Sequence, residues 1–465
     1  MKVPSPNPRT ALSPGGFGSL VLLCAFLSGC ANIARVENVP LEHAVAGTGY
    51  GATLEPGHSK FRVALAFSGG GTRAAALSYG VLKELRNTEV EVDGERVRLL
   101  DLVTYISSVS GGSFASAYYG LYGDRIFEDF EERFLRKDID HKLAVDLLSP
   151  VDLFRLTFTP YTRSDMAMDL YDEEVFGGAT FADLEKADGP LLNINATDID
   201  VGTVFTFVQP HFDLICSDLS KLRVSQAVTA SSAVPGVFSP LRLQNHAGSC
   251  DLLEPEWISE AMADPAKARR RYHDARNAAT YLDTEERPNI FLVDGGVSDN
   301  IGARRMLAEI YQAGGVMALV EEQALELPEQ LLYIVVNSQA EAQHEWVKGA
   351  SVPSAIEVLS AVSSVGIYRY NFDTVELLRE SAASWSREAS DHGVPMEARV
   401  AEVAFDHVAD PEERAFLNDV ATSFTLPDET IDRLIEVGGR LLRESSEYQA
   451  FLASFGGAVS APDGP

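Results

Sequence analysis

Two strand-length apolar runs, each followed at once by a glycine-rich turn and a helical pattern, most strongly constrain the fold of this 465-residue chain. The first run, Phe61–Phe67, precedes a helical pattern over about 73–86. The second run, Leu99–Ile106, precedes a helix of small residues at 113–119. Strands that alternate with helices in this way form a mostly parallel sheet that helices cover on both faces. The sequence therefore predicts an α/β protein.

The same alternation continues to about residue 345. Four further segments have the length and apolar character of buried strands: Leu191–Ala196, Val204–Val208, Asn289–Asp294 and Leu331–Asn337. We therefore predict a three-layer α/β/α domain at 60–345, with the polar stretch 241–287 as a surface insertion. The pattern of residues 346–455 predicts a helical C-terminal region with one strand near 398–405. We expect this region to pack on the core. Residues 456–465 are expected to be disordered.

The first 29 residues are typical of a secretory signal peptide. They contain two basic residues and no acid. Their apolar run, Phe17–Leu27, is about half the roughly 20 residues that span a bilayer. The segment Leu27–Cys30 resembles the lipobox of bacterial lipoproteins, in which the cysteine is lipidated and becomes the mature N-terminus. The alternative is an ordinary signal peptide followed by an incidental cysteine.

The lipobox implies that Cys30 carries acyl chains and is followed by a tether at 30–59. It implies a location in the bacterial cell envelope, and Ala31 indicates by analogy the outer membrane, facing the periplasm or the exterior. The net charge of -30, from 38 basic and 68 acidic residues, disfavours nucleic acid and anionic headgroups as partners. Membrane association would therefore depend on the acyl chains, which contribute about 0.8 kcal/mol per buried methylene.

Two other cysteines, Cys216 and Cys250, remain in the mature chain. They can pair in an oxidising compartment, or remain as two buried thiols, and the sequence leaves both possibilities open. The chain contains no C-x-x-C, H-E-x-x-H or EF-hand motif. We therefore expect no metal site and no required cofactor.

The turn Ser68–Arg73 contains three consecutive glycines between the first predicted strand and its helix. Gly69, Gly70 and Gly71 allow backbone N–H groups to converge at the positive end of a helix. Such a nest binds an anion, either a phosphate or the oxyanion of an acyl-transfer intermediate. The lysine of a phosphate-binding Walker A loop is missing here. Because Arg73 in the first turn opposes the helix dipole, we expect it to meet an anion or a buried carboxylate.

Two further turns supply a nucleophile and an acid. In Ser108–Gly112 a sharp strand–turn–helix would expose the hydroxyl of Ser110, although Ser108 stands where the usual G-x-S-x-G elbow has glycine. Asp294 ends a predicted strand before two glycines, where an Asx turn or a helix cap is the alternative role. None of the nine histidines lies in these turns. Asp294 is therefore the candidate base for Ser110, and it would need desolvation to act as one.

Together these motifs resemble the patatin-like phospholipases over most of residues 60–305. The matching segments, in chain order, are Gly69–Arg73, Ser110, Asn195–Asp198, Ala230–Pro240 and Asp294–Gly296. The resemblance implies a patatin-type α/β/α fold, with Ser110 as nucleophile, Asp294 as proton acceptor and the glycine-rich loop as oxyanion site. It also implies a lipid substrate, whose ester bond is cleaved through an acyl-serine intermediate as in phospholipase A or lysophospholipase.

Two alternatives to this function remain at this point. One is a non-catalytic envelope lipoprotein that binds lipid or a partner protein, and the other is an acyl hydrolase of thioesters or peptides. The sequence does not identify a protein partner, a headgroup or an acyl-chain length. Two amphipathic stretches, Leu143–Phe158 and Ala355–Tyr368, are expected to be ordinary core helices, the alternative being a surface that guides a lipid tail or contacts a membrane.

Overall fold

The computed structural model describes residues 33–456, apart from 46, 54–59, 188, 267, 342–348, 350–351 and 354. The predicted signal peptide, Cys30 and the predicted tail after Gly456 lie outside the described residues. The described part of the predicted tether differs from expectation, because it packs on the folded body. Val36 and Tyr50 are buried, and the Tyr50 hydroxyl accepts a hydrogen bond from the Leu192 N–H at 2.8 Å.

A nine-stranded sheet forms the middle layer, in the order β1-β8-β9-β6-β5-β2-β10-β11, with β7 paired to β6. Its strands are β1 (Ala34–Arg35), β2 (Phe61–Phe67), β5 (Val103–Val109), β6 (Leu191–Asp198), β7 (Thr203–Thr206), β8 (Leu241–Gln244), β9 (Asn289–Asp294), β10 (Gln330–Asn337) and β11 (Glu397–Ala404). The strands from β6 to β11 along this order are parallel, whereas β9 is antiparallel to both β6 and β8. A separate hairpin joins β3 (Glu89–Val92) and β4 (Glu95–Arg98).

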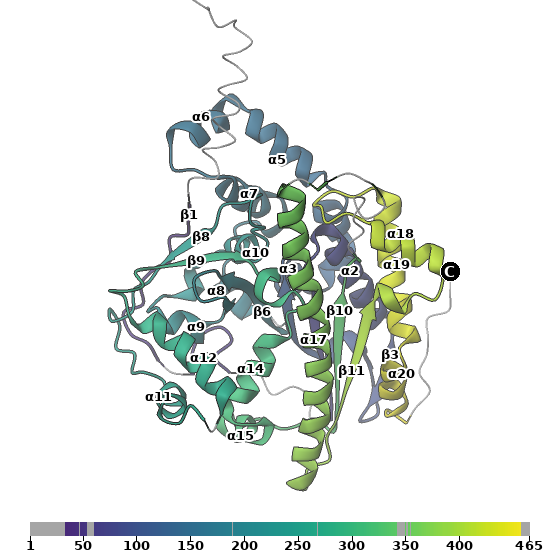
Figure 1. Ribbon diagram of the computed structural model, residues 1–465. Coiled ribbons are helices and arrows are strands. Elements are labelled where there is room, and N and C mark those ends of the chain that lie inside the picture. Colours follow the sequence, from purple (N-terminus) through teal and green to yellow (C-terminus); the bar gives the residue numbers. More distant parts are fainter. Residues whose placement is uncertain are drawn as a thin grey trace, which may run out of the picture.

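Helices cover both faces of this sheet (Figure 1). They are α2 (Gly71–Asn87), α3 (Gly111–Tyr122), α4 (Ile126–Phe130), α5 (Ile139–Leu148), α6 (Pro150–Phe158), α7 (Arg163–Tyr171), α8 (Phe181–Lys186), α9 (Gln209–Leu214), α10 (Val224–Ser231), α11 (Glu256–Ala263), α12 (Arg269–Ala279), α13 (Gly296–Asp299), α14 (Arg304–Ala313), α15 (Val316–Glu322), α17 (Ala355–Asp391), α18 (Pro411–Asp419), α19 (Asp428–Glu444) and α20 (Ser446–Ala453). Alternate side chains of β2 enter two cores: Leu65 packs with α2, α3 and α19, and Ala66 packs with α14 and α17. The predicted three-layer α/β/α fold is confirmed.

The predicted helical C-terminal region is present, and it is also part of the sheet and of the core. Its strand β11 pairs with β10 along its whole length. Its helix α19 crosses α2 at backbone contact, since a Cβ on Gly80 would lie 2.1 Å from the carbonyl oxygen of Ile435. A Cβ on Gly438 would lie 2.4 Å from the carbonyl oxygen of Leu77. Glycine at both positions therefore permits the close packing of the C-terminal region on α2.

The predicted insertion at 241–287 begins inside the sheet. Its first residues form β8, which pairs with β9 on one side and with β1 on the other. Leu241 and Leu243 point into the core and are buried. Two alternating apolar residues are too short a pattern to separate a strand from a loop. The rest of the insertion contains the helices α11 and α12 and the loops beside them.

The two amphipathic stretches do not form ordinary core helices, which corrects the expectation from sequence. Helices α5 and α6 leave Val145, Val151, Phe154 and Phe158 exposed. The first half of α17 likewise exposes apolar residues, Tyr368 among them. The pattern correctly predicted helices with an apolar face, but it did not predict that these apolar side chains are exposed. Within the part of the chain that the structure describes, no helix has the length and apolar character that crossing a bilayer requires.

The structure joins Cys216 and Cys250 by a disulfide, with the two Cα atoms 5.7 Å apart. This bond connects the segment after α9 to the start of the insertion. The two cysteines are 34 positions apart in the sequence. A crosslink over a loop of this length removes conformational entropy from the unfolded chain.

Replacing both cysteines in the variant Cys216→Ala/Cys250→Ala is expected to lower the free energy of unfolding by about 4 kcal/mol, because the unfolded chain regains that entropy. The measurement is urea unfolding of oxidised wild type, reduced wild type and the double variant. The reduced wild type should match the variant, and the variant should not respond to reductant. Equal unfolding midpoints for all three would contradict the expected stabilisation.

Candidate active site

Ser110 occupies the sharp turn between β5 and α3. β5 lies between β2 and β6 in the sheet, so this turn emerges from the middle of the molecule. The φ angle of Ser110 is 50°, in the left-handed region that non-glycine residues rarely adopt. The next residue must be glycine, since a Cβ on Gly111 would lie 2.0 Å from the carbonyl oxygen of Gly71. The serine turn and the glycine-rich loop are therefore in direct backbone contact.

Asp294 forms a hydrogen bond with Ser110, although the two residues are 184 positions apart in the sequence. The Ser110 hydroxyl donates a hydrogen bond to Oδ2 of Asp294 at 2.9 Å. The other carboxylate oxygen, Oδ1, accepts the N–H of Gly296 at 2.7 Å. Both side chains are buried, with Ser110 5% and Asp294 7% exposed. Burial raises the pKa of Asp294 to about 6, and the hydrogen bonds from Gly296 and Ser110 oppose this rise.

The strand register brings these two residues to the same level of the sheet. Val109 is the partner of Asn195 on β6, and Ala196 is the partner of Asp294 on β9. Because β9 runs antiparallel to β6, its last residue returns to the level where β5 ends. Among the described residues, no histidine makes a hydrogen bond to either Ser110 or Asp294.

Ser231 ties the serine turn to the aspartate turn. Its hydroxyl accepts the Ser110 N–H at 2.8 Å and donates to the Asn195 carbonyl at 2.6 Å. Its own carbonyl accepts the Gly295 N–H at 3.0 Å. All of these groups are buried, so each needs a partner inside the protein. Ser231 thus fixes the backbone on both sides of the Ser110–Asp294 hydrogen bond.

Polar side chains of β6 extend this support. The Thr197 hydroxyl donates to the Asp294 carbonyl at 2.8 Å, and the Asn195 side-chain amide donates to Oγ of Ser107 at 2.8 Å. Sequence reasoning recognised Asn195–Asp198 and Ala230–Pro240 as family segments but assigned them no function. Polar residues inside an otherwise buried strand were the available signal, because buried polar groups require partners.

The residue that departs from the usual elbow, Ser108, is accommodated inside the core. Its side chain is fully buried, and its Oγ accepts a hydrogen bond from the Ser116 hydroxyl at 2.6 Å. Ser116 lies on α3, on the turn of helix that packs against β5. The extra hydroxyl therefore has a partner and leaves the serine turn intact.

The glycine-rich loop presents fewer free donors than its sequence suggests. The N–H of Gly69, predicted to be an oxyanion donor, donates to the Asn300 carbonyl at 3.0 Å. A backbone amide carries one proton, so Gly69 is committed to holding the loop against α13 and the residues that follow it. The N–H groups of Gly70 and Gly71 make no hydrogen bond with any described residue. These two amides remain as the donors that the loop can offer to an anion.

Arg73 pairs with no carboxylate among the described residues, so the carboxylate that the sequence led us to expect is not its partner. Its guanidinium donates to the carbonyl of Val420 and, at 3.1 Å, to the hydroxyl of Thr422. The neighbouring Thr72 N–H donates to the Ser423 carbonyl at 2.9 Å. Burial lowers the pKa of Arg73 to about 10. The cation instead anchors the glycine-rich loop to the C-terminal region, through partners that lie 347 positions or more away in sequence.

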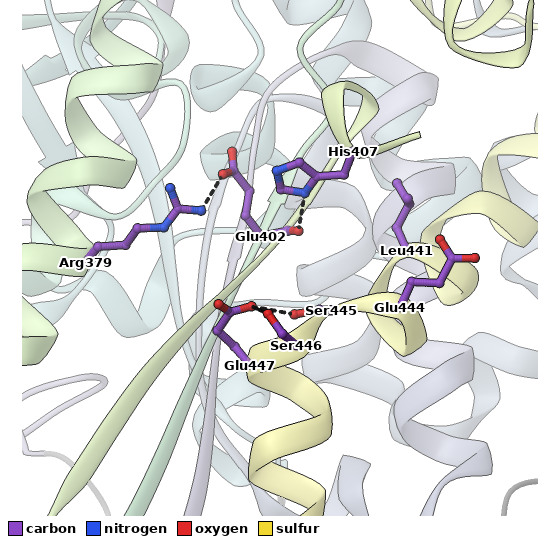
Figure 2. A pocket seen from close by; sticks show the side chains of 8 residues that line it. All are labelled: Arg379, Glu402, His407, Leu441, Glu444, Ser445, Ser446 and Glu447. Carbon is purple, nitrogen blue, oxygen red and sulfur yellow. Dashed lines mark hydrogen bonds and ion pairs between the residues drawn. The ribbon is translucent and has the colours of Figure 1, made fainter. Parts of the chain in front are cut away.

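A separate polar hollow of about 320 Å³ contains none of the predicted site residues (Figure 2). Glu402 at its centre pairs with Arg379 at 3.0 Å, and its backbone carbonyl lies 3.0 Å from Nδ1 of His407. The remaining lining residues come from α19, α20 and the residue between them: Leu441, Glu444, Ser445, Ser446 and Glu447. Over the described residues, no three or more His, Cys, Asp or Glu side chains are arranged to hold a metal ion.

Comparison with solved structures returns human GIVD cytosolic phospholipase A2, with a TM-score of 0.42 and 12% identity, covering 96% of this chain and 67% of that one. The complex of that enzyme with methyl gamma-linolenyl fluorophosphonate gives a TM-score of 0.37 and 13% identity, covering 85% of this chain. This chain spans 59% of the length of the enzyme in that complex. No match was found among the curated proteins.

The family described as patatin-like phospholipase matches residues 65–307, slightly more than half of the chain. The match includes the glycine-rich loop, Ser110, Ser231 and Asp294. It also includes the strands β5, β6 and β9, which bring these residues together. The chain therefore belongs to the patatin-like phospholipase family.

Proposed function

We propose that this protein is a lipid acyl hydrolase that cleaves carboxylic ester bonds with a Ser110–Asp294 dyad. The observation that carries the proposal is the 2.9 Å hydrogen bond from the Ser110 hydroxyl to a buried carboxylate. The uncommitted amides of Gly70 and Gly71, in the loop that contacts Gly111, supply what acyl transfer further requires. Family membership supports a lipid ester as the substrate, of the phospholipase A or lysophospholipase type.

In the first half of the reaction, Asp294 removes the proton of the Ser110 hydroxyl as Oγ attacks the substrate carbonyl carbon. The negative charge that develops on the carbonyl oxygen is stabilised by the Gly70 and Gly71 N–H groups. Each such donor contributes about 3 kcal/mol to transition-state stabilisation. The tetrahedral intermediate then expels the alcohol, which takes the proton from Asp294 and leaves an acyl-Ser110 ester.

In the second half, water attacks this ester while Asp294 accepts one of its protons. The second tetrahedral intermediate expels Ser110 Oγ, which recovers the proton from Asp294, and the fatty acid leaves. A pKa near 6 suits Asp294 to both steps, since it remains ionised at neutral pH but is a stronger base than an exposed carboxylate.

The resemblance of Leu27–Cys30 to a lipobox supports a proposed location for the enzyme. We propose that acyl chains on Cys30 hold the protein on a bacterial envelope membrane, with the outer membrane as the proposed site. Two or three acyl chains bind a bilayer firmly where one chain does not, and this binding offsets the repulsion between a strongly acidic protein and anionic lipids.

The lipid anchor can be tested by growing a bacterial host that expresses the protein on an alkyne fatty acid. We expect wild type to be labelled and the Cys30→Ser variant not to be labelled.

Replacing the nucleophile tests the acyl-enzyme directly. A fluorophosphonate probe should label wild type at Ser110, as mass spectrometry of the modified peptide would show, and Ser110→Ala should not be labelled. Ser108→Ala is the matched control, because its hydroxyl bonds only inside the core, and it should still be labelled. Labelling of Ser110→Ala at the wild-type rate would contradict the assignment of Ser110.

The raised pKa of Asp294 predicts a pH profile. Because the carboxylate must be ionised to accept a proton, kcat/KM on a soluble ester should rise with pH and reach half its maximum near pH 6. Asp294→Asn should lower kcat by at least about 100-fold, since removing a general base typically costs 10² to 10⁴ in rate. A profile with its midpoint near pH 4, or near-normal turnover by Asp294→Asn, would contradict the dyad.

The same pKa also predicts an effect of Asp294 on stability. A carboxyl group whose pKa rises from 3.8 to about 6 on folding destabilises the folded state by on the order of 3 kcal/mol at pH 8. This cost disappears as the pH falls from 6 toward 4, because the folded protein then binds the proton. Asp294→Asn should therefore unfold at a higher temperature than wild type at pH 8, and the difference should shrink at pH 5. Equal melting temperatures at both pH values would show that the carboxylate is not destabilised by burial.

A further inference from the structure

Helix α6 turns an apolar face toward solvent. Val151, Phe154 and Phe158 are 66%, 59% and 73% exposed, and their spacing of three and four places them on one face of the helix. The rings of Phe154 and Phe158 lie 5.1 Å apart, centroid to centroid. Leu156, on another face, is buried. A helix on the surface of a water-soluble protein normally has polar residues on the face that contacts solvent. On α6 this face is apolar instead.

The charged residues of α6 are satisfied within the protein. Asp152 and Arg155 form an ion pair at 3.3 Å. The Arg155 guanidinium also lies over the ring of Tyr161, 3.6 Å from its centre. The exposed face of α6 therefore carries no unpaired charge of its own that would oppose its entry into an apolar environment.

A second apolar stripe lies on the first half of α17. Val358, Val365, Tyr368 and Phe372 are all exposed, and spacings of seven, three and four residues place them on one face. Figure 1 shows α6 and the beginning of α17 at the same end of the molecule. We call these two stripes, Val151, Phe154 and Phe158 with Val358, Val365, Tyr368 and Phe372, the docking face.

Helix α6 and the beginning of α17 lie at the end of the molecule toward which the central parallel strands run. The arrows of β10 and β11 point toward this end in Figure 1. Because β2 and β5 run parallel to β10, Ser110 at the end of β5 lies at the same end. Helix α7, which follows α6, is joined to the loop before β8 by a hydrogen bond from the Ser164 hydroxyl to the Ser239 carbonyl at 2.7 Å. In that loop Val237 is exposed as well.

The described start of the chain lies at this part of the surface. The described chain starts at Ile33, and the Ala34 N–H donates to the Pro240 carbonyl, in the same loop. Strand β1 packs against α7. Cys30 precedes Ala34 by four positions, which span at most about 14 Å even when fully extended. Acyl chains on Cys30 would therefore hold α6 and α7 close to the bilayer.

We propose that the docking face inserts into the surface of a bilayer of zwitterionic phospholipid, whose headgroups carry no net charge. The proposal rests on the proposed function in one respect, because a lipid substrate and a lipid anchor make a bilayer the occupant. The charge favours the same occupant: with a net charge of -30 the protein is repelled by anionic headgroups, whereas the apolar stripes gain from contact with any acyl region. Docking places the end of the molecule at which Ser110 lies against the membrane that supplies its ester.

The test compares the binding to phosphatidylcholine vesicles of protein that begins at Ala31, with and without Phe154→Asp/Phe158→Asp. Beginning the chain at Ala31 removes both the anchor residue and the apolar run Phe17–Leu27, and so isolates the contribution of the docking face. The double variant is expected to partition at least about tenfold more weakly in co-sedimentation, because two phenyl groups no longer enter the lipid. Leu253→Asp is the matched control, because Leu253 is 85% exposed and lies three positions before α11. Figure 1 shows α11 at the other end of the molecule. This variant should bind vesicles like its parent.

Hydrolysis separates this proposal from the proposed function. On a soluble short-chain ester the double variant should turn over like its parent, which also shows that it is folded, while its hydrolysis of vesicle lipid falls together with binding. If the parent hydrolyses neither substrate, the proposed function fails, and co-sedimentation still decides docking. A second variant, Phe158→Trp, should show a blue-shifted emission and quenching by brominated phosphatidylcholine.

Three results would overturn the docking proposal. The first is unchanged vesicle binding by the double variant. The second is binding that strengthens when phosphatidylglycerol is added, because that would indicate an electrostatic rather than an apolar contact. The third is a dimer of the parent, seen by analytical ultracentrifugation, that the double variant abolishes, because a second copy of the chain would then cover the docking face.

Discussion

A carboxylate buried without a cation is the constraint on which the rest of the site depends. No described lysine or arginine pairs with Asp294, which receives N–H and O–H donors only. On the neighbouring strand β6, Asp198 is equally buried, but it pairs with Arg287 and accepts the Tyr281 hydroxyl at 2.7 Å. An arginine beside Asp294 would lower the pKa of its carboxyl group and weaken it as a base. The neutral hydroxyls and amides around it hold the turn in place while leaving the carboxylate basic.

The C-terminal region completes this arrangement, although it lies outside the part of the chain that matches the family. It supplies the carbonyl groups that hold Arg73 and Thr72, and therefore the loop that carries the Gly70 and Gly71 amides. The backbone contact between α2 and α19 fixes the helix into which this loop leads. A region whose role the sequence did not indicate is thus part of the environment of the proposed oxyanion site.

Apolar runs and glycine motifs in the sequence predicted the features that depend on neighbouring residues, which are the strand bounds and the positions of the turns. The bounds of β2 and β9 agree with the predicted runs, and the two glycine-flanked turns lie where their motifs placed them. The sequence did not predict the features that depend on distant partners: the antiparallel direction of β9, the short strands β1 and β8, the use of the Gly69 N–H by Asn300, and the carbonyl that holds Arg73. Periodicity likewise predicted that α6 is amphipathic, but the side of the helix that remains uncovered depends on how the rest of the chain packs.

The burial that raises the pKa of Asp294 also restricts the access of a lipid to Ser110, so both depend on the segments that cover the site. The loop between α18 and α19 contacts the glycine-rich loop beside the site. Its Ser423 carbonyl accepts the Thr72 N–H, and its Ser423 hydroxyl donates to Asp140 of α5 at 2.6 Å. The Phe424 N–H also donates to Asp140, at 3.1 Å. Helix α5 leads into α6, so these hydrogen bonds connect the helix of the proposed docking face to the glycine-rich loop.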